Sequence, residues 1–163
     1  VRASVGSNVG EMIHGLTEAI LPRPTGPTMA KNWSIRGRVL LVEDGPDNQA
    51  LMGHFLRQSG AVVDVAANGL EALEKAAEAR PDAVVMDIVM PHMDGFEAAK
   101  RLRQSHGRSI FLVALTGWDG EKDRERTREA GFDAHLVKPV ELDSLRRLFS
   151  GLRTSAPAHT GAC

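Results

Sequence analysis

The sequence predicts an α/β fold built on one parallel sheet, and two patterns support this prediction. Between residues 38 and 152, apolar runs of strand length alternate five times with stretches that have helical spacing. The first, third and fourth runs are apolar throughout, as expected of parallel strands buried on both faces. Alternating strands and helices favour right-handed connections within a single sheet. The expected strands are residues 39–42, 61–63, 83–86, 110–115 and 136–137.

The first three helices are predicted from apolar spacing and from capping residues. The first helix places Leu51, Met52, Phe55 and Leu56 on one face and stops at Gly60. Each of the next two begins with a cap followed three residues later by Glu, at 68–71 and 94–97, which is typical of a helix N-terminus. We expect their inward residues to be Leu70 and Leu73 in the second helix, and Phe96 and Leu102 in the third.

The last two helices differ sharply in polarity. In residues 119–130, nine of twelve side chains are charged and Ala130 alone is apolar. A helix that is polar all round buries little, so we expect either a solvated surface helix or one that moves and meets a partner. The final helix is strongly amphipathic, with its expected inward residues being Leu142, Leu145, Leu148, Phe149 and Leu152.

Composition and length limit the function classes. The 163 residues carry 20 basic and 21 acidic side chains, a net charge of −1, which argues against nucleic acid or an anionic membrane as a partner. The single cysteine, Cys163, excludes an internal disulfide and a cysteine-based zinc site. We see no apolar run of the ~20 residues that a membrane helix needs and no secretory signal, and therefore expect a cytoplasmic location.

The two ends of the chain read as accessory segments around one domain at 38–152. Residues 1–37 contain a proline-rich stretch at 22–27, and we interpret them as a linker, the tail of an upstream domain or a cloning remnant, with a short helix expected at 11–21. The alternative is that this helix docks or dimerises. Residues 153–163 are expected to form a flexible tail. Because the chain begins with Val1, we expect it to be part of a longer protein.

Chemically informative residues follow the predicted strands. Glu43 and Asp44 follow the first strand, Asp87 the third, Thr116 the fourth and Lys138 the fifth. Ligands of open α/β sheets bind at this carboxyl edge. Each pair of carboxylates at ~4 Å costs on the order of 4 kcal/mol at an effective dielectric of 20, which favours a divalent cation such as Mg²⁺. The ammonium and the hydroxyl suit the oxygens of a phosphoryl group.

These residues lie in four motifs, and together the motifs resemble the receiver domain of two-component response regulators. They are Val-Leu-Leu-Val-Glu-Asp at 39–44, Val-Met-Asp-Ile-Val-Met-Pro-His-Met-Asp-Gly at 85–95, Ala-Leu-Thr-Gly at 114–117 and Val-Lys-Pro at 137–139. The resemblance covers residues 38 to about 152. It implies a flavodoxin-like doubly wound sheet of five parallel strands in the order 2-1-3-4-5, with five helices.

The same resemblance implies the roles of the residues at the carboxyl edge of the sheet. Asp87 would be phosphorylated, and Thr116 and Lys138 would contact the phosphoryl group. A magnesium ion would be held by Asp44, Asp87 and the backbone carbonyl of Val89, with Glu43 acting through water. The peptide bond between Lys138 and Pro139 would be cis.

The implied function is a phosphoacceptor module rather than an enzyme. A histidine kinase or a histidine phosphotransfer protein would donate the phosphoryl group, and the domain would then change conformation for a protein partner. The motifs look most like receivers attached to hybrid sensor histidine kinases, and we predict no DNA-reading module after the fifth helix. The alternatives are a stand-alone single-domain regulator, a pseudo-receiver that only binds protein, and an aspartate-nucleophile phosphohydrolase. The last of these needs a second acid where Val89 stands.

Two positions depart from the family or stand out beside the site. Three residues before Lys138 the family often has Tyr or Phe, an aromatic that swings inward on activation, whereas this chain has His135. We therefore consider His135 and Thr116 as switch candidates. For the histidine, the alternatives are a pH-sensitive switch and a partly exposed packing residue. Trp118 follows Thr116 closely, and we expect it either to shield an acyl phosphate from water or to pack on the polar helix.

Overall fold

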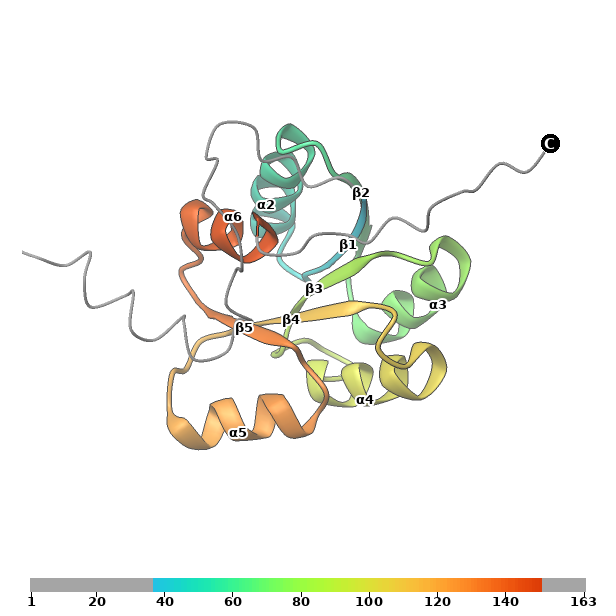
Figure 1. Ribbon diagram of the computed structural model, residues 1–163, viewed down its shortest axis with the longest axis vertical. Helices are drawn as coiled ribbons and strands as arrows, with labels where there is room; N and C mark the ends of the chain where they lie inside the picture. Colours follow the sequence, from blue (N-terminus) through green and yellow to red (C-terminus); the bar gives the residue numbers. More distant parts are fainter. Residues whose placement is uncertain (1–36, 151–163) are drawn as a thin grey trace, which may run out of the picture.

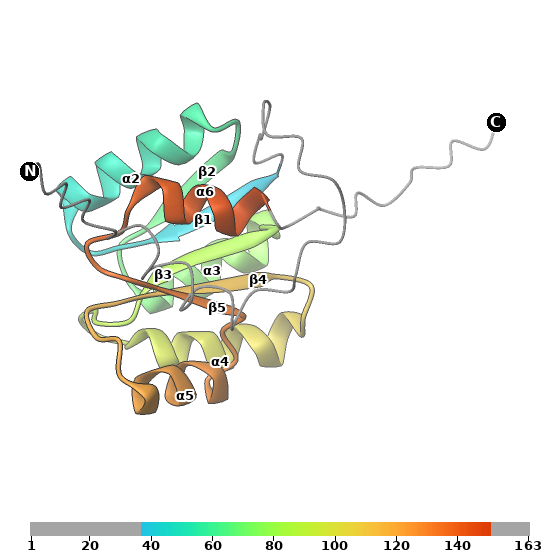
Figure 2. The ribbon, with the colours of Figure 1, turned by 60° about the vertical axis from the view of Figure 1, so that its left-hand side comes forward.

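The computed structural model describes residues 37–150, which form a parallel sheet with helices on both faces (Figures 1 and 2). The strand order is β2-β1-β3-β4-β5, so the predicted fold class and order are confirmed. The expected helix at 11–21, the tail at 153–163 and Leu152 lie outside the described residues. The strands are β1 (Arg38–Val42), β2 (Val62–Ala66), β3 (Ala83–Asp87), β4 (Phe111–Thr116) and β5 (Ala134–Val137). The helices are α2 (Pro46–Gln58), α3 (Gly69–Ala79), α4 (Gly95–His106), α5 (Glu121–Glu129) and α6 (Leu142–Ser150).

The sheet separates two apolar cores, because successive strand residues point to opposite faces. On β1, Leu40 and Val42 face the core that contains α3 and α4, while Val39 and Leu41 face the core that contains α2 and α6. All five residues of β3 are buried, as predicted for a central parallel strand. Figure 2 shows the helices that cover these two cores: α2 and α6 lie on one side of the sheet, and α4 and α5 lie on the other.

The predicted caps of α3 and α4 are present. The Asn68 side chain accepts a hydrogen bond from the Glu71 N–H at 2.9 Å, and Asp94 accepts one from the Glu97 N–H at 2.8 Å. The Glu71 carboxylate in turn accepts from the Ala67 N–H, one residue before the cap. At the start of α4, a Cβ on Gly95 would lie 2.7 Å from the Asp87 carbonyl oxygen, so only glycine lets this helix begin so close to the end of β3.

Three leucines that we expected to face the core are exposed instead, so these predictions were wrong. Leu51 is 68% exposed, Leu70 50% and Leu142 45%. Helix α3 packs through Ala72 and Ala76, which bring its axis close to the sheet and leave the larger leucine outside the contact. In α2 and α6 the buried stripe is likewise narrower than the apolar pattern, and it consists of Gly53, Phe55, Leu56, Leu145, Leu148 and Phe149.

Helix α5 is confirmed as a polar helix, and Thr127 is its buried member. It contacts α4 through the Arg126 guanidinium, which lies 4.2 Å from the centre of the Phe96 ring. Such a cation–π contact stabilises a surface pair by about 0.5–1 kcal/mol. The helix therefore lies against its neighbours with little apolar burial. None of the helices in residues 37–150 is both long and apolar enough to cross a membrane.

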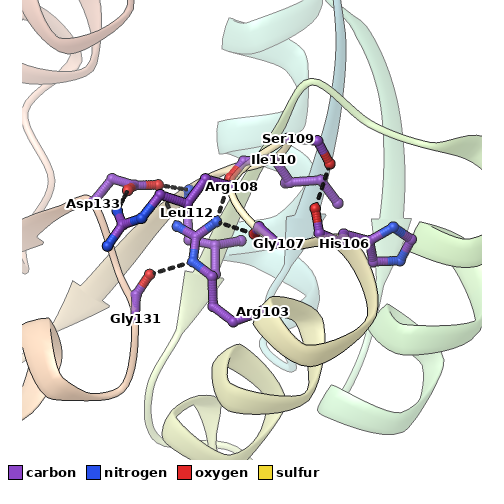
Figure 3. A network of polar contacts seen from close by, with 9 residues as sticks. All are labelled: Arg103, His106, Gly107, Arg108, Ser109, Ile110, Leu112, Gly131 and Asp133. Carbon is purple, nitrogen blue, oxygen red and sulfur yellow. Dashed lines mark hydrogen bonds and ion pairs between the residues drawn. The ribbon is translucent and has the colours of Figure 1, made fainter.

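A polar network ties the C-terminal end of α4 to the beginnings of β4 and β5 (Figure 3). Arg103 donates to the carbonyl oxygens of Gly131, Gly107 and Ile110 at 2.7–2.8 Å and forms an ion pair with Asp133. Asp133 also accepts from the Leu112 N–H at 2.8 Å. This network lies at the edge of the sheet where β4 and β5 begin, opposite the edge where the strands end.

Candidate functional site

The strand ends bring the predicted site residues to one edge of the sheet. Glu43 directly follows β1, Asp87 ends β3, Thr116 ends β4 and Lys138 directly follows β5. These four strands are neighbours in the sheet and run parallel, so their carboxyl ends meet at the same edge. Asp44 follows Glu43 and is exposed at the mouth of the site.

Three carboxylates form a cluster at this edge. One oxygen each from Glu43, Asp44 and Asp87 lies within 4.8 Å of the others. Glu43 and Asp87 are 2% and 6% exposed, whereas Asp44 faces solvent. This set of hard oxygen donors beside solvent fits Mg²⁺, which binds through one or two carboxylates and keeps several waters. The Val89 N–H donates to Asp87 Oδ1 at 3.0 Å, and the Val89 carbonyl as a ligand stays a prediction.

Lys138 supplies a positive charge inside the cluster. Its Nζ lies 2.6 Å from Asp87 Oδ2 and 3.2 Å from Glu43 Oε2. Partial burial disfavours the ammonium, but the hydrogen bonds and charges of Asp87 and Glu43 outweigh it and raise the pKa of Lys138. The lysine is therefore charged at neutral pH. The peptide bond between Lys138 and Pro139 is cis, as the resemblance implies.

Thr116 is buried at the same edge, and its hydroxyl is engaged by its own loop. Oγ1 lies 3.1 Å from the Trp118 N–H nitrogen and 3.3 Å from the Trp118 carbonyl oxygen, so it accepts from one and donates to the other. A Cβ on Gly117 would meet no atom within 4 Å, which leaves space beside Thr116. Trp118 is 64% exposed, so it packs little against α5, while shielding of an acyl phosphate stays a prediction.

His135 is of intermediate burial on β5, and its side chain is more covered than the residue as a whole. Its side chain is 7% exposed, and Nε2 is 3.7 Å from Asp119 Oδ1 in the β4–α5 loop. Burial lowers the pKa of His135, and the nearby Arg124 guanidinium lowers it further, while Asp119 acts in the opposite direction. Sequence reasoning did not single out Asp119 and Arg124 as partners of this histidine. Their spacing matches neither a strand nor a helix face, so no sequence pattern marks the contact.

Comparison with known proteins identifies the family to which this fold and site belong. The model of the response regulator receiver domain matches residues 39–150, and the chain belongs to this family, the receiver domains of two-component systems. An uncharacterised 14.6 kDa protein of Leptolyngbya boryana is 40% identical over 111 residues, which are 68% of this chain and 85% of that protein. The response regulator MprA of Mycobacterium leprae is 37% identical over 121 residues. This match covers 74% of the chain and 53% of MprA, so the chain spans about half the length of that regulator.

Solved structures of receiver domains share the fold. The receiver domain of the Pseudomonas aeruginosa sensor histidine kinase PA1611, solved with a magnesium ion in its active-site cleft, has a TM-score of 0.65 and 36% identity, covering 70% of this chain and 94% of that one. The co-crystal structure of the Saccharomyces cerevisiae histidine phosphotransfer protein Ypd1 with the receiver domain of Ssk1 gives a TM-score of 0.66 and 30% identity, covering 72% of this chain and 93% of the matched chain.

Proposed function

We propose that the domain accepts a phosphoryl group on Asp87 from a phosphohistidine and changes conformation for a protein partner. The observation that carries this proposal is the Lys138 ammonium 2.6 Å from the buried Asp87 carboxyl group, within a cluster of two further carboxyl groups. The donor is a histidine kinase or a histidine phosphotransfer protein. The similarity to the Ssk1 receiver, crystallised with such a protein, supports this class of donor.

The transfer of the phosphoryl group uses side chains that are already present at the carboxyl edge of the sheet. An Asp87 carboxylate oxygen attacks phosphorus, the P–N bond to the donor imidazole breaks, and the imidazole leaves with the electron pair. Aspartate side chains are ordinarily ionised at neutral pH, so an attack of this kind needs no general base. Lys138 holds a phosphoryl oxygen, and Thr116 holds another once its hydroxyl leaves the Trp118 carbonyl. The reaction then depends mainly on positioning and electrostatic stabilisation.

We infer that Mg²⁺ is the cofactor of this step. Asp44 and Asp87, with the backbone carbonyl of Val89, would hold the ion, and Glu43 would act through water. When bound, the ion supplies positive charge to the oxygens of the transferring phosphoryl group. The acidic cluster supports the assignment, and so does the magnesium site of the similar PA1611 receiver.

The parent protein is proposed to be a hybrid sensor histidine kinase of the cytoplasm, with this domain as its receiver and not an enzyme in its own right. The motifs around Asp44 and Asp87 support this context, as does the similarity to the PA1611 receiver. A stand-alone regulator is the alternative, supported by the match to the small Leptolyngbya protein. A phosphohydrolase is disfavoured, because the position of its second acid holds the apolar Val89, 61% exposed.

The test is phosphorylation by acetyl phosphate with Mg²⁺, followed by intact mass. We expect one phosphoryl group on the parent protein and none when a chelator is added first. Asp87→Asn should remove the modification, whereas Asp143→Asn, which changes an exposed aspartate of α6, should keep it. Phosphorylation of Asp87→Asn at the parent rate would overturn the proposal.

A further inference from the structure

Three polar side chains connect the β4–α5 loop to α5 and β5, and we call them the Asp119 latch: Asp119, Arg124 and His135. The Arg124 guanidinium donates to Asp119 Oδ1 from Nε at 3.0 Å and from Nη2 at 2.5 Å. His135 Nε2 lies 3.7 Å from the same oxygen, which is beyond hydrogen-bond range. The Asp119 carboxylate is therefore hydrogen-bonded to Arg124, and the His135 imidazole packs beside it.

The strand fixes where the imidazole lies. Ala134 and Leu136 of β5 face the core of α2 and α6, so His135 points to the opposite face of the sheet, where α5 lies. Its register partner on β4 is Ala114, whose short side chain leaves room for a ring. With 7% of the side chain exposed, the imidazole is almost withdrawn from water.

A proton on His135 would create a charge conflict at this place. The charged groups that act on the ring are Asp119 from the loop and Arg124 from α5, and its register partner on β4 is the uncharged Ala114. The Asp119 carboxylate, 41% exposed, would then face two cations. The imidazolium competes with the guanidinium for Asp119. Displacement of the guanidinium breaks the connection between the loop and α5.

We propose that the Asp119 latch is a proton-operated catch on the β4–α5 loop, held while His135 is neutral and released when His135 takes up a proton. The released segment includes Trp118, whose backbone engages the Thr116 hydroxyl. Release would therefore free the Thr116 hydroxyl as well. The consequence for a bound phosphoryl group rests on the proposed function, but the catch itself does not.

The direction of the pH dependence follows from the geometry. The cationic form of His135 is disfavoured in the latched state, because burial and Arg124 both oppose it and lower its pKa. The latch is thus fully stable above about pH 6.5, the ordinary pKa of histidine, and weakens as pH falls from there through the lowered pKa. The released state binds the proton more tightly and is favoured by acid.

The experiment is an NMR titration of the unphosphorylated protein, without any phosphoryl donor. The ring of His135 and the backbone amides of Gly117, Trp118 and Asp119 should titrate with one common midpoint below pH 6.5. His135→Gln should abolish the amide transition, whereas His92→Gln, which changes an exposed histidine of the β3–α4 loop, should leave it intact. Amides that stay unchanged through the His135 midpoint would overturn the proposal.

Two further variants keep the test decisive if His135→Gln folds poorly. Arg124→Gln removes a repelling cation and should move the midpoint of the His135 ring to higher pH, while Asp119→Asn removes the attracting anion and should move it to lower pH. Each variant also removes the hydrogen bonds of the latch, so the amides should no longer follow the ring. Amides that still follow the ring in either variant would contradict the catch. A failure of phosphorylation by acetyl phosphate would count against the proposed function and leave the latch titration unaffected.

Discussion

Replacement of Lys138 by Met tests the electrostatics of the site most sharply. The lysine is the counter-charge of two buried carboxylates, with Nζ 2.6 Å from Asp87 and 3.2 Å from Glu43. Met keeps much of the side-chain length and removes the charge. Among residues 37–150, Lys138 is the cation that pairs with Glu43 and Asp87, so the variant leaves the mutual repulsion of these carboxylates uncompensated in the folded state.

The magnitude follows from the distances. Two carboxylate oxygens at the 4.8 Å limit of the cluster repel by about 3.5 kcal/mol at an effective dielectric of about 20. Breaking a buried ion pair by removing one partner costs about 3–5 kcal/mol. Lys138 is 30% exposed and Asp44 faces solvent, so water weakens both terms. We expect the free energy of unfolding at pH 7 to fall by about 2–3 kcal/mol, and the melting temperature by roughly 10 °C.

The assay is thermal and urea unfolding of the parent and of Lys138→Met across pH and Mg²⁺ concentration. The deficit should shrink with Mg²⁺, which replaces the lost charge. It should also shrink at high pH, because the raised pKa of Lys138 makes its contribution complete below about pH 10.4 and lost as pH rises through the folded-state pKa. The exposed Lys100→Met is the matched control and should change stability little. Equal stability of Lys138→Met and the parent at pH 7 would refute the reasoning.

Three further predictions concern the scaffold, the metal and the polar helix. Arg103→Met should lower the free energy of unfolding by about 3 kcal/mol, since it leaves three carbonyl oxygens without this donor and removes one ion-pair partner of the largely buried Asp133. The surface-paired Arg101→Met should cost under about 1 kcal/mol by the same urea titration, and equal costs would contradict the network. In calorimetric Mg²⁺ titrations, Asp44→Asn should lose more affinity than Glu43→Gln, and the reverse order would contradict the water-mediated role of Glu43. Hydrogen exchange should be faster in α5 than in α4, because α5 buries Thr127 alone whereas α4 buries four residues; slower exchange in α5 would refute this.

The sheet and the residues at its carboxyl edge could be predicted from the sequence, because the positions of strand ends in a parallel sheet follow from the direction of the chain. Parallel strands place their last residues at one edge, so Asp87 and Lys138 meet although 51 residues separate them. Contacts between side chains of different helices and strands do not follow from chain direction. The contacts of Arg103 with Asp133 and of His135 with Asp119 depend on how helices settle on the sheet, which periodicity does not encode. For the same reason Leu51 appears inward by spacing and lies in solvent.

The central claim is that Asp87 itself carries the phosphoryl group, and chemical trapping tests it most directly. Borohydride reduces an aspartyl phosphate to homoserine, and peptide sequencing by mass spectrometry then locates the converted residue. After treatment with acetyl phosphate and Mg²⁺, we expect homoserine at position 87, with Glu43 and Asp44 unchanged. Conversion at either neighbouring carboxylate, with Asp87 intact, would contradict it.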